Sequence, residues 1–347
     1  MLCGGISVIF FYVLPVTVLS GHRVDVDKVE GLVRQWAPLV WLSPEEKFMP
    51  SNVEEFLVNT NIADEHGSVL TGSKSPARFF QYNSKKVFLV PKRSLDSLKE
   101  NYTSFLYGKS PKSYPPVPIY AVVTYCSNPA SSEFPPDLLP TFHVTYWMFY
   151  PFNEGKDSCF LGKVPAPLIF SKCFGHYRKL GNHFGDWEHM SLSFSGHPYP
   201  DQLFLSVHDA GAYYAYQRNT NTFRFQAKME RKGVAQVPSY PEFIRLQGGH
   251  PVLFAAEGSH GLWSTPGDHE FIRVPKITDR TGFGAPWKTW GSIVFYHIGR
   301  SEMPAWMSFK GKWGNPKTKC ILLKKFGLCE YTEGPRGLLR ETNDFYC

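Results

Sequence analysis

Two carboxylates and a histidine lie close together near the middle of the chain, in the segment His183-Phe184-Gly185-Asp186-Trp187-Glu188. From Asp186 onward the residues alternate as in a β-strand, which places Asp186 and Glu188 on one face. That face continues with three large apolar residues, Met190, Leu192 and Phe194. Two anions at the edge of an apolar interior repel each other and lose hydration, and a bound cation would offset both costs.

The same region offers further ligands for such a cation. Gly185 permits a tight bend, so His183 can turn back onto the site. His208 ends one expected strand and His260 follows another, and we expect them to act as ligands or as donors to the carboxylates. A mixed set of carboxylate and imidazole groups suits Ca²⁺, Mg²⁺, Mn²⁺ or Zn²⁺.

Other interpretations of these residues stay open. Asp186 and Glu188 can form salt bridges with Arg178, Lys179 or Arg218, and histidines such as His208 and His260 are often only hydrogen-bonded parts of a core. Trp187 and His189, on the opposite face of the strand, are expected to be packing and surface residues.

The N-terminus and the cysteines indicate secretion. Residues 6–19 are almost wholly apolar but too few for a comfortable transmembrane helix, so we expect a signal peptide over residues 1–20; an uncleaved anchor is the alternative. Cys3 lies in this segment, which leaves an even set for disulfides: Cys126, Cys159, Cys173, Cys320, Cys329 and Cys347. Proximity favours pairing Cys159 with Cys173 and Cys320 with Cys329. Asn101-Tyr102-Thr103 is a glycosylation sequon.

Composition favours a turn-rich β protein that lacks any nucleic-acid motif. The chain is 43% hydrophobic and 16% aromatic, with 29 glycines and 28 prolines. The net charge of +7 is spread out except over residues 310–325. This basic stretch can contact an anionic membrane surface or glycan, or simply be a solvated face.

The pattern of elements predicts a mainly β fold, a jelly-roll-like β-sandwich with short flanking helices. Helices are expected over residues 24–36, after a capping box at Ser51 to Glu54, and over residues 94–101. Proline-rich connectors are expected at residues 110–118 and 128–140. Strands are expected at residues 79–82, 87–90, 119–125, 141–150, 188–194, 202–208, 222–226, 252–256 and 292–296. We divide the chain into the signal (1–20), an N-terminal segment packed on the core (21–78), the sandwich (79–300) and a basic C-terminal extension (301–347).

Several blocks, in order, resemble the vacuolar protein sorting-associated protein 62 family. They begin at Trp36-Ala37-Pro38 and Glu45-Glu46-Lys47-Phe48 and end at Gly334-Pro335-Arg336-Gly337. Between them lie Tyr146-Trp147-Met148-Phe149-Tyr150, His183-Phe184-Gly185-Asp186-Trp187-Glu188-His189, Val207-His208-Asp209 and Ser259-His260-Gly261. The resemblance covers residues 36–337, and the family's name implies a connection with trafficking.

A more local resemblance is to the necrosis- and ethylene-inducing peptide-like cytolysins. Their central motif has the order of His183, Asp186, Trp187 and Glu188. The resemblance implies that His183, Asp186 and Glu188 surround a divalent cation on a β-sandwich that recognises sugar headgroups of sphingolipids. It also implies a toxin-like or defence-like role.

Together these observations predict a secreted protein that binds a divalent cation and engages a glycan, a lipid headgroup or another anionic ligand. Three aromatic residues, Tyr213, Tyr214 and Trp263, are candidates for stacking on sugars, and core packing is their alternative role. A metal-dependent hydrolase with Asp186 or Glu188 as general base is the main rival function. A disulfide-stapled extracellular structural protein is the other.

Overall fold

The computed structural model describes residues 26–126, 139–170, 172–230, 238–272, 276–320, 329–339, 345 and 347. The expected signal peptide and most of the connector at residues 128–140 lie outside these residues.

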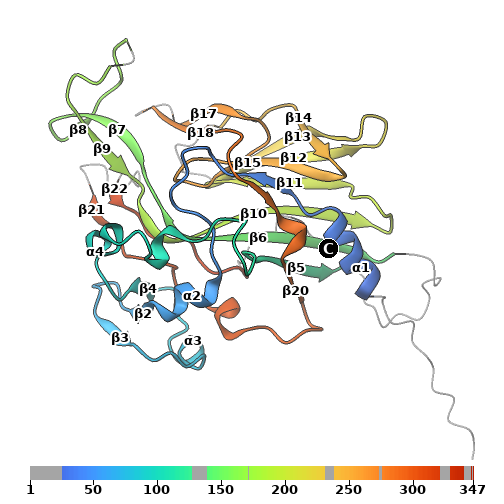
Figure 1. The fold of residues 1–347 in the computed structure, drawn as a ribbon, viewed down its shortest axis with the longest axis horizontal. Coiled ribbons are helices and arrows are strands. Elements are labelled where there is room, and N and C mark those ends of the chain that lie inside the picture. Colours follow the sequence, from blue (N-terminus) through green and yellow to red (C-terminus); the bar gives the residue numbers. More distant parts are fainter. Residues whose placement is uncertain are drawn as a thin grey trace, which may run out of the picture.

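One long curled sheet dominates the structure (Figure 1). Its strand order is β19-β1-β15-β14-β13-β12-β11-β10-β6-β5-β20, with β16 paired to β15. The strands are β1 (Leu39–Trp41), β5 (Ile119–Tyr125), β6 (Thr141–Asn153), β10 (His183–Ser195), β11 (Gln202–Val207), β12 (Ala210–Gln217), β13 (Thr222–Glu230), β14 (Phe243–Gln247), β15 (His250–Ala255), β16 (Leu262–Trp263), β19 (Pro286–Lys288) and β20 (Ile293–His297). The predicted mainly β fold is confirmed, and the curl brings the two halves of the sheet face to face as a sandwich.

The main core lies inside the curl. Strands β6 and β10 run antiparallel over their full length, with Asp186 opposite Tyr150 and Glu188 opposite Met148. The three apolar residues predicted to follow Glu188 on its face, Met190, Leu192 and Phe194, are all buried in this core. Helix α1 (Val26–Gln35) closes one end of it with Val29, Leu32 and Val33.

A second core covers the outer face of β5, β6 and β10. It is built from α2 (Val53–Val58), β2 (Thr60–Ala63), α3 (Arg78–Gln81), β4 (Phe88–Pro91), α4 (Leu95–Glu100), η1 (Phe105–Tyr107), η3 (Ala305–Ser308) and the residues that follow. The exposed strand β3 (Val69–Thr71) pairs with β2. Trp187 is buried here between Phe149, Trp306 and Trp313. The expectation of a surface position for His189 is wrong: its ring is buried 4.2 Å from that of Trp147, because this second layer covers the sheet.

The remaining elements lie at the edges of the sandwich. They are β7 (Lys156–Leu161), β8 (Val164–Pro165), β9 (His176–Leu180), β17 (Gly267–Ile272), β18 (Ile277–Thr281), η2 (Thr289–Gly291), β21 (Thr318–Cys320) and β22 (Cys329–Tyr331).

The three expected helices form, with one change in capping. Asn52 rather than Ser51 caps α2, accepting from the amide of Glu55. The strand expected at residues 79–82 is wrong, since residues 79–81 lie in α3 and Tyr82 caps its C-terminal end. Its first turn starts at Ser75-Pro76, where the fixed backbone of proline suits a helix start, and Arg78 donates to the carbonyls of Leu57 and Thr60.

Three disulfides join the six expected cysteines. Cys159–Cys173 and Cys320–Cys329 confirm the pairs favoured by proximity, and the third is Cys126–Cys347.

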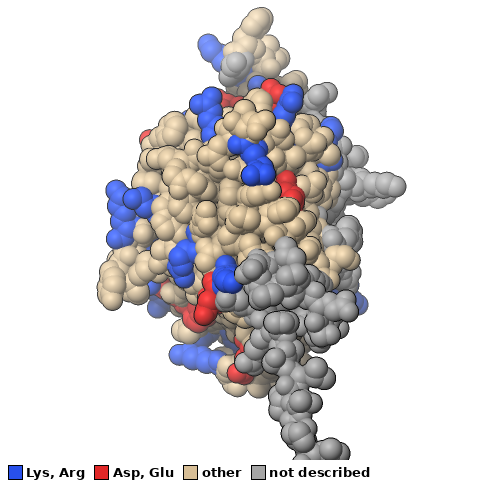
Figure 2. All heavy atoms as spheres, turned by 90° about the vertical axis from the view of Figure 1, so that its right-hand side faces the viewer, with Lys and Arg blue, Asp and Glu red and all other residues tan. Residues whose placement is uncertain are grey.

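The charged surface shows no extended basic patch on the side seen in Figure 2, where Lys and Arg side chains are scattered among Asp and Glu. Within the described part of the basic stretch, Lys317 pairs with Glu333 and Lys319 with Glu330. No helix among the described residues is both long and apolar enough to span a bilayer.

Candidate metal centre and neighbouring pocket

Gly185 sets the direction of His183. The structure begins β10 at His183, three residues earlier than a simple alternation suggests, and Gly185 lies within the strand at φ +61°. This left-handed residue interrupts the alternation, so Phe184 and Trp187 share the outer core while His183 turns toward Asp186. A Cβ on Gly185 would lie 3.1 Å from Phe56 and Trp313, so glycine is needed here for space as well as for backbone geometry.

His183 is prepared to act as a metal ligand. Its Nδ1 donates to the carbonyl of Gly185 at 3.1 Å, which leaves Nε2 as the unprotonated nitrogen. Burial lowers the pKa of His183 and so favours the neutral ring, against the attraction of Asp186. Nε2 lies 4.0 Å from Oδ1 of Asp186. Metal ligands lie about 2.0–2.6 Å from the ion they bind, so two ligand atoms 4.0 Å apart can bind the same ion.

Both carboxylates of the motif are buried, with 5% of each residue exposed. Asp186 accepts from the amide of Trp187 and from His260 Nδ1 at 3.1 Å. Burial alone would raise the pKa of Asp186, but the hydrogen bond from His260 and the positive charge of that ring lower it. Asp186 therefore stays ionised, in contact with a histidine rather than with the Arg or Lys partners considered from the sequence.

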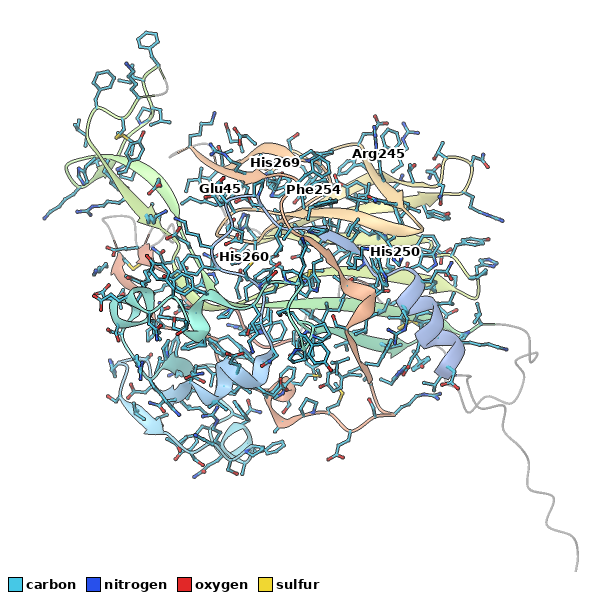
Figure 3. The ribbon with its side chains drawn as sticks, viewed as in Figure 1. Glu45, Arg245, His250, Phe254, His260 and His269 are labelled. Carbon is cyan, nitrogen blue, oxygen red and sulfur yellow. A yellow bond between two sulfur atoms is a disulfide. The ribbon has the colours of Figure 1, made fainter. Side chains whose placement is uncertain are left out.

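His260 connects Asp186 to a carboxylate that the sequence interpretation missed. It is fully buried, and its Nε2 donates to the carbonyl of Phe48 at 3.0 Å and lies 3.7 Å from Oε2 of Glu46. Burial alone would lower the pKa of His260, but the attraction of Glu46 and the hydrogen bond to Asp186 raise it to about 9. His260, labelled in Figure 3, is thus an imidazolium that donates from Nδ1 to the carboxylate of Asp186 and forms an ion pair with Glu46.

Tyr150 completes the cluster from the opposing strand. Its ring stacks on His260 with the centroids 3.8 Å apart, and its buried hydroxyl makes no hydrogen bond within the described structure. Burial raises the pKa of Tyr150, and the nearby charges of Glu46, Glu188 and Asp186 raise it further. A buried hydroxyl without a partner is uncommon and points to a group that the protein itself does not supply.

His208 lies in a second polar cluster around Asp279. This fully buried carboxylate accepts from His208 Nε2 at 2.7 Å, Ser259 Oγ at 2.6 Å and Trp263 Nε1 at 2.9 Å. Lys156 Nζ lies 3.1 Å away. His208 and Lys156 hold the pKa of Asp279 well below its usual range, although burial opposes them. The structure therefore ties His208 to Asp279 and does not place it directly on Asp186.

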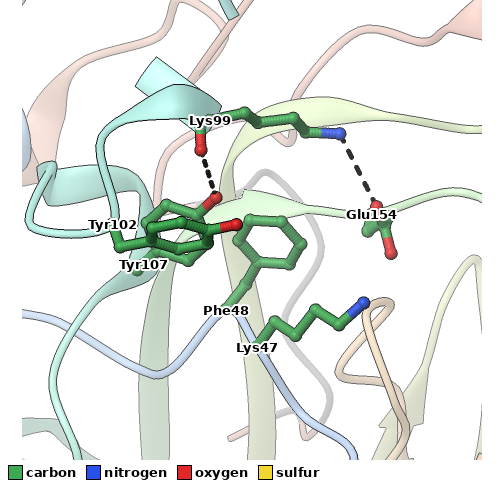
Figure 4. A pocket seen from close by; sticks show the side chains of 6 residues that line it. All are labelled: Lys47, Phe48, Lys99, Tyr102, Tyr107 and Glu154. Atoms are coloured by element: carbon green, nitrogen blue, oxygen red, sulfur yellow. Dashed lines mark hydrogen bonds and ion pairs between the residues drawn. The ribbon is translucent and has the colours of Figure 1, made fainter. Parts of the chain in front are cut away.

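An open pocket is lined in part by Lys47 and Phe48, which directly follow Glu46 in the chain (Figure 4). Its volume is about 490 Å³, and its lining residues are Lys47, Phe48, Lys99, Tyr102, Tyr107 and Glu154. Phe48 stacks on Tyr107 at 5.3 Å, and Lys99 pairs with Glu154 at 3.6 Å. The ammonium groups of Lys47 and Lys99 extend on the same side of the Phe48 ring.

Two of the three aromatic residues expected to stack on sugars cannot do so. Tyr214 and Trp263 are fully buried in the main core, in β12 and β16, so they present no face to a ligand. Tyr213 is half-buried, with its ring 4.9 Å from that of Phe204. Tyr102, which lines the neighbouring pocket and is 82% exposed, is an aromatic residue that a ligand can reach.

One compact group of three potential ligand atoms, mutually within 4.8 Å, occurs among the described residues, at Cys126, His143 and Cys347. Its two sulfurs form a disulfide and are not thiolate ligands. Asp186 and Glu188 lie on the inner face of β10 with His183 turned toward Asp186, but the three do not form so compact a set.

The site also contains residues that the sequence interpretation missed, namely Glu46, Tyr150, Lys156 and Asp279. Tyr150 had a signal, because pairing the expected strands antiparallel brings residues 141–150 beside the carboxylates. Glu46, Lys156 and Asp279 carried none, since they reach the site only through long-range folding.

Comparison with known proteins supports the first resemblance. The chain is 25% identical to two proteins of Saccharomyces cerevisiae, the putative vacuolar protein sorting-associated protein TDA6 and vacuolar protein sorting-associated protein 62, over 90% of its own length in each case. It spans 66% of the length of each of these relatives. No model of a known protein family matches the chain.

Among solved structures, the chain is similar to necrosis and ethylene inducing protein 2 from the causal agent of witches' broom disease of cocoa. The identity is 14%, with 67% of each chain covered and a TM-score of 0.25. A superposition this loose carries no argument about site or function. The resemblance to the vacuolar protein sorting-associated protein 62 family is therefore confirmed from the sequence comparisons, whereas the likeness to the cytolysin is only distant.

Proposed function

We propose that this is a secreted protein that binds a divalent cation at His183, Asp186 and Glu188 and engages a sugar-containing or anionic ligand beside it. One observation carries the proposal. His183 holds its Nδ1 proton on a backbone carbonyl and aims Nε2 toward an ionised, buried Asp186. That arrangement of a neutral imidazole beside a carboxylate is the one that metal sites use.

The surrounding groups fit a cation as well. The Tyr150 hydroxyl makes no hydrogen bond within the described structure and lies near three carboxylates, so a cation or a water bound to it would give the hydroxyl oxygen a partner. The donors are mostly oxygens with one imidazole, a set suited to Ca²⁺, Mg²⁺ or Mn²⁺ and also open to Zn²⁺.

The neighbouring pocket supports the choice of ligand. The exposed Tyr102 offers an aromatic face, and the lining residues include two lysines against one glutamate. A volume of about 490 Å³ lies within the range of small-ligand sites. A sugar that carries an acidic group matches this lining.

Three disulfides agree with an oxidising compartment and hence with secretion. Asn101, exposed at the end of α4, is accessible for a glycan.

The test is metal analysis combined with thermal unfolding in the presence and absence of a chelator. The wild type should contain a divalent metal and lose melting temperature on chelation, because a cation bound only to the native state stabilises it. Asp186→Asn and Glu188→Gln should lose the metal and become insensitive to chelator. Asp268→Asn, an exposed carboxylate paired with Arg280 at 3.4 Å, is the matched control and should behave as the wild type. If the wild type is metal-free after supply of all four ions and chelator has no effect on it, the proposal is wrong.

A purely structural role is the second candidate, favoured by His260. As an imidazolium between Asp186 and Glu46 it already neutralises part of the buried charge. On this reading Asp186→Asn still destabilises the fold, but the loss is the same with and without chelator. The experiment above therefore separates the two functions.

A further inference from the structure

A disulfide-stapled hairpin projects from the body of the molecule. Strands β7, β8 and β9 carry it beyond the sandwich at the upper left of Figure 1. Its two sides are paired from Lys156 opposite Leu180 to Phe160 opposite His176, and Cys159–Cys173 joins them. Ile169 and Lys172 exchange both backbone hydrogen bonds around a tight turn that carries Phe170. We call residues 156–180 the apolar hairpin.

The apolar hairpin exposes far more large hydrophobic side chains than its length would predict. Phe170 is 93% exposed, Phe174 69% and Leu161 66%. Seven of the eighteen exposed large hydrophobic residues of the described structure lie here: Leu161, Val164, Leu168, Ile169, Phe170, Phe174 and Tyr177. Isolated exposed hydrophobics are ordinary, but a contiguous group on a protrusion marks a surface that is covered by something else.

The charges on the apolar hairpin indicate what covers it. Lys163 and Lys172 are exposed near the tip, and within the described residues neither makes an ion pair. No Asp or Glu occurs between residues 158 and 178. The one carboxylate of the hairpin, Asp157, lies at its base and pairs with Lys179 at 3.6 Å. Apolar side chains at a tip flanked by lysines match the hydrocarbon boundary and the anionic headgroups of a bilayer.

We propose that the apolar hairpin anchors the protein on the surface of a bilayer that contains anionic lipids. Phe170 and Phe174 enter the acyl boundary, while Lys163 and Lys172 remain among the headgroups. A convex, projecting tip can reach a flat surface without steric hindrance from the body, whereas a protein partner would have to supply a matching groove. The disulfide holds the hairpin in shape before contact, so little conformational entropy is lost on binding.

Co-sedimentation with vesicles tests this anchor without the cation site or any sugar ligand. The vesicles are phosphatidylcholine alone or phosphatidylcholine with phosphatidylserine, and chelator is present throughout. The wild type should bind the mixed vesicles. Phe170→Ser with Phe174→Ser should weaken partitioning by about tenfold or more, because two large apolar side chains no longer leave water. Lys163→Glu with Lys172→Glu should abolish the preference for phosphatidylserine.

The matched control is Phe80→Ser, which removes a 65% exposed phenylalanine from α3 outside the apolar hairpin. It should bind as the wild type does. A tryptophan placed at the tip, Phe170→Trp, should be quenched by lipids with brominated acyl chains beyond the quenching of the wild type. Absence of binding to mixed vesicles, or equal loss of binding in the Phe80 and hairpin variants, would overturn the proposal. Binding to bare lipid without metal leaves the cation proposal untouched, so the two can fail separately.

Discussion

Replacing Asp279 by asparagine should be among the most costly single substitutions in this protein. The carboxylate is fully buried and accepts from His208, Ser259 and Trp263, with Lys156 3.1 Å away. Breaking a buried ion pair from one side typically costs about 3–5 kcal/mol. Lys156 keeps partial access to water, with 16% of its side chain exposed, so we expect a loss near the lower end, about 3 kcal/mol. That corresponds to roughly a hundredfold change in the folding equilibrium constant.

Urea unfolding of the wild type, Asp279→Asn and Asp268→Asn measures the loss in free energy of unfolding. It compares the same change, Asp to Asn, at a buried position and at an exposed one. Asp268 lies on the neighbouring strand β17, opposite Arg280, and its ion pair is mostly exposed. Its loss should cost less than about 0.5 kcal/mol, since exposed pairs are screened by water. Equal free energies of unfolding for the two variants would refute the reasoning from burial. A chelator should leave the difference unchanged, because Asp279 acts through protein donors.

Three further predictions concern the same region. Acid should remove the stabilisation that Asp279 provides. Because folding lowers the pKa of Asp279, its contribution to the free energy of unfolding is complete above the unfolded pKa of about 3.9 and is lost as the pH falls below that value. The free energy of unfolding of Asp279→Asn should therefore fall less steeply with decreasing pH than that of the wild type. Gly185→Ala should lower the free energy of unfolding by about 1–3 kcal/mol and weaken cation binding, because residue 185 has a positive φ and the new Cβ would make contacts at 3.1 Å. Gly196→Ala, at φ +80° with one contact at 3.4 Å, should lower the free energy of unfolding less in the same assay. In the presence of chelator, Tyr150→Phe should be as stable as the wild type or slightly more stable, because the substitution removes a buried hydroxyl that makes no hydrogen bond. The same variant should bind the cation more weakly in a titration, and a large loss of stability in chelator would contradict this prediction.

Local pattern predicted those elements whose sequences agree with their final environment. The strand at residues 119–125 is found as Ile119–Tyr125, since its β-branched and aromatic run is buried on both faces. The aromatic pair Phe79-Phe80 favoured a strand, but tertiary contacts of Arg78 and the preceding Ser75-Pro76 made it a helical turn. Strand β12 was missed because its Ala210-Gly211-Ala212 start lacks β-branched residues.

The candidate site divides in the same way. Alternation along β10 correctly placed Asp186 and Glu188 on the face of Met190, because that signal is local. Glu46 lies 212 residues from the Gly258 amide that it accepts from, and no periodicity encodes that separation. Residue type alone suggested that sugars stack on Tyr213, Tyr214 and Trp263. The last two are buried in the structure and cannot contact a ligand.

The loop that follows β15 supplies hydrogen-bond donors to three buried carboxylates. Neighbouring residues of this loop serve different anions: Ser259 donates to Asp279, and His260 donates to Asp186. The Gly258 amide donates to Glu46 at 2.8 Å, and the Gly258 carbonyl accepts from the amide of Glu154, which lines the pocket. Each of these bonds restrains the loop from a different side, so its position is set by contacts that do not involve a cation. Because His260 on this firmly held loop fixes the Asp186 carboxylate, the proposed cation centre on β10 needs little reorganisation to bind.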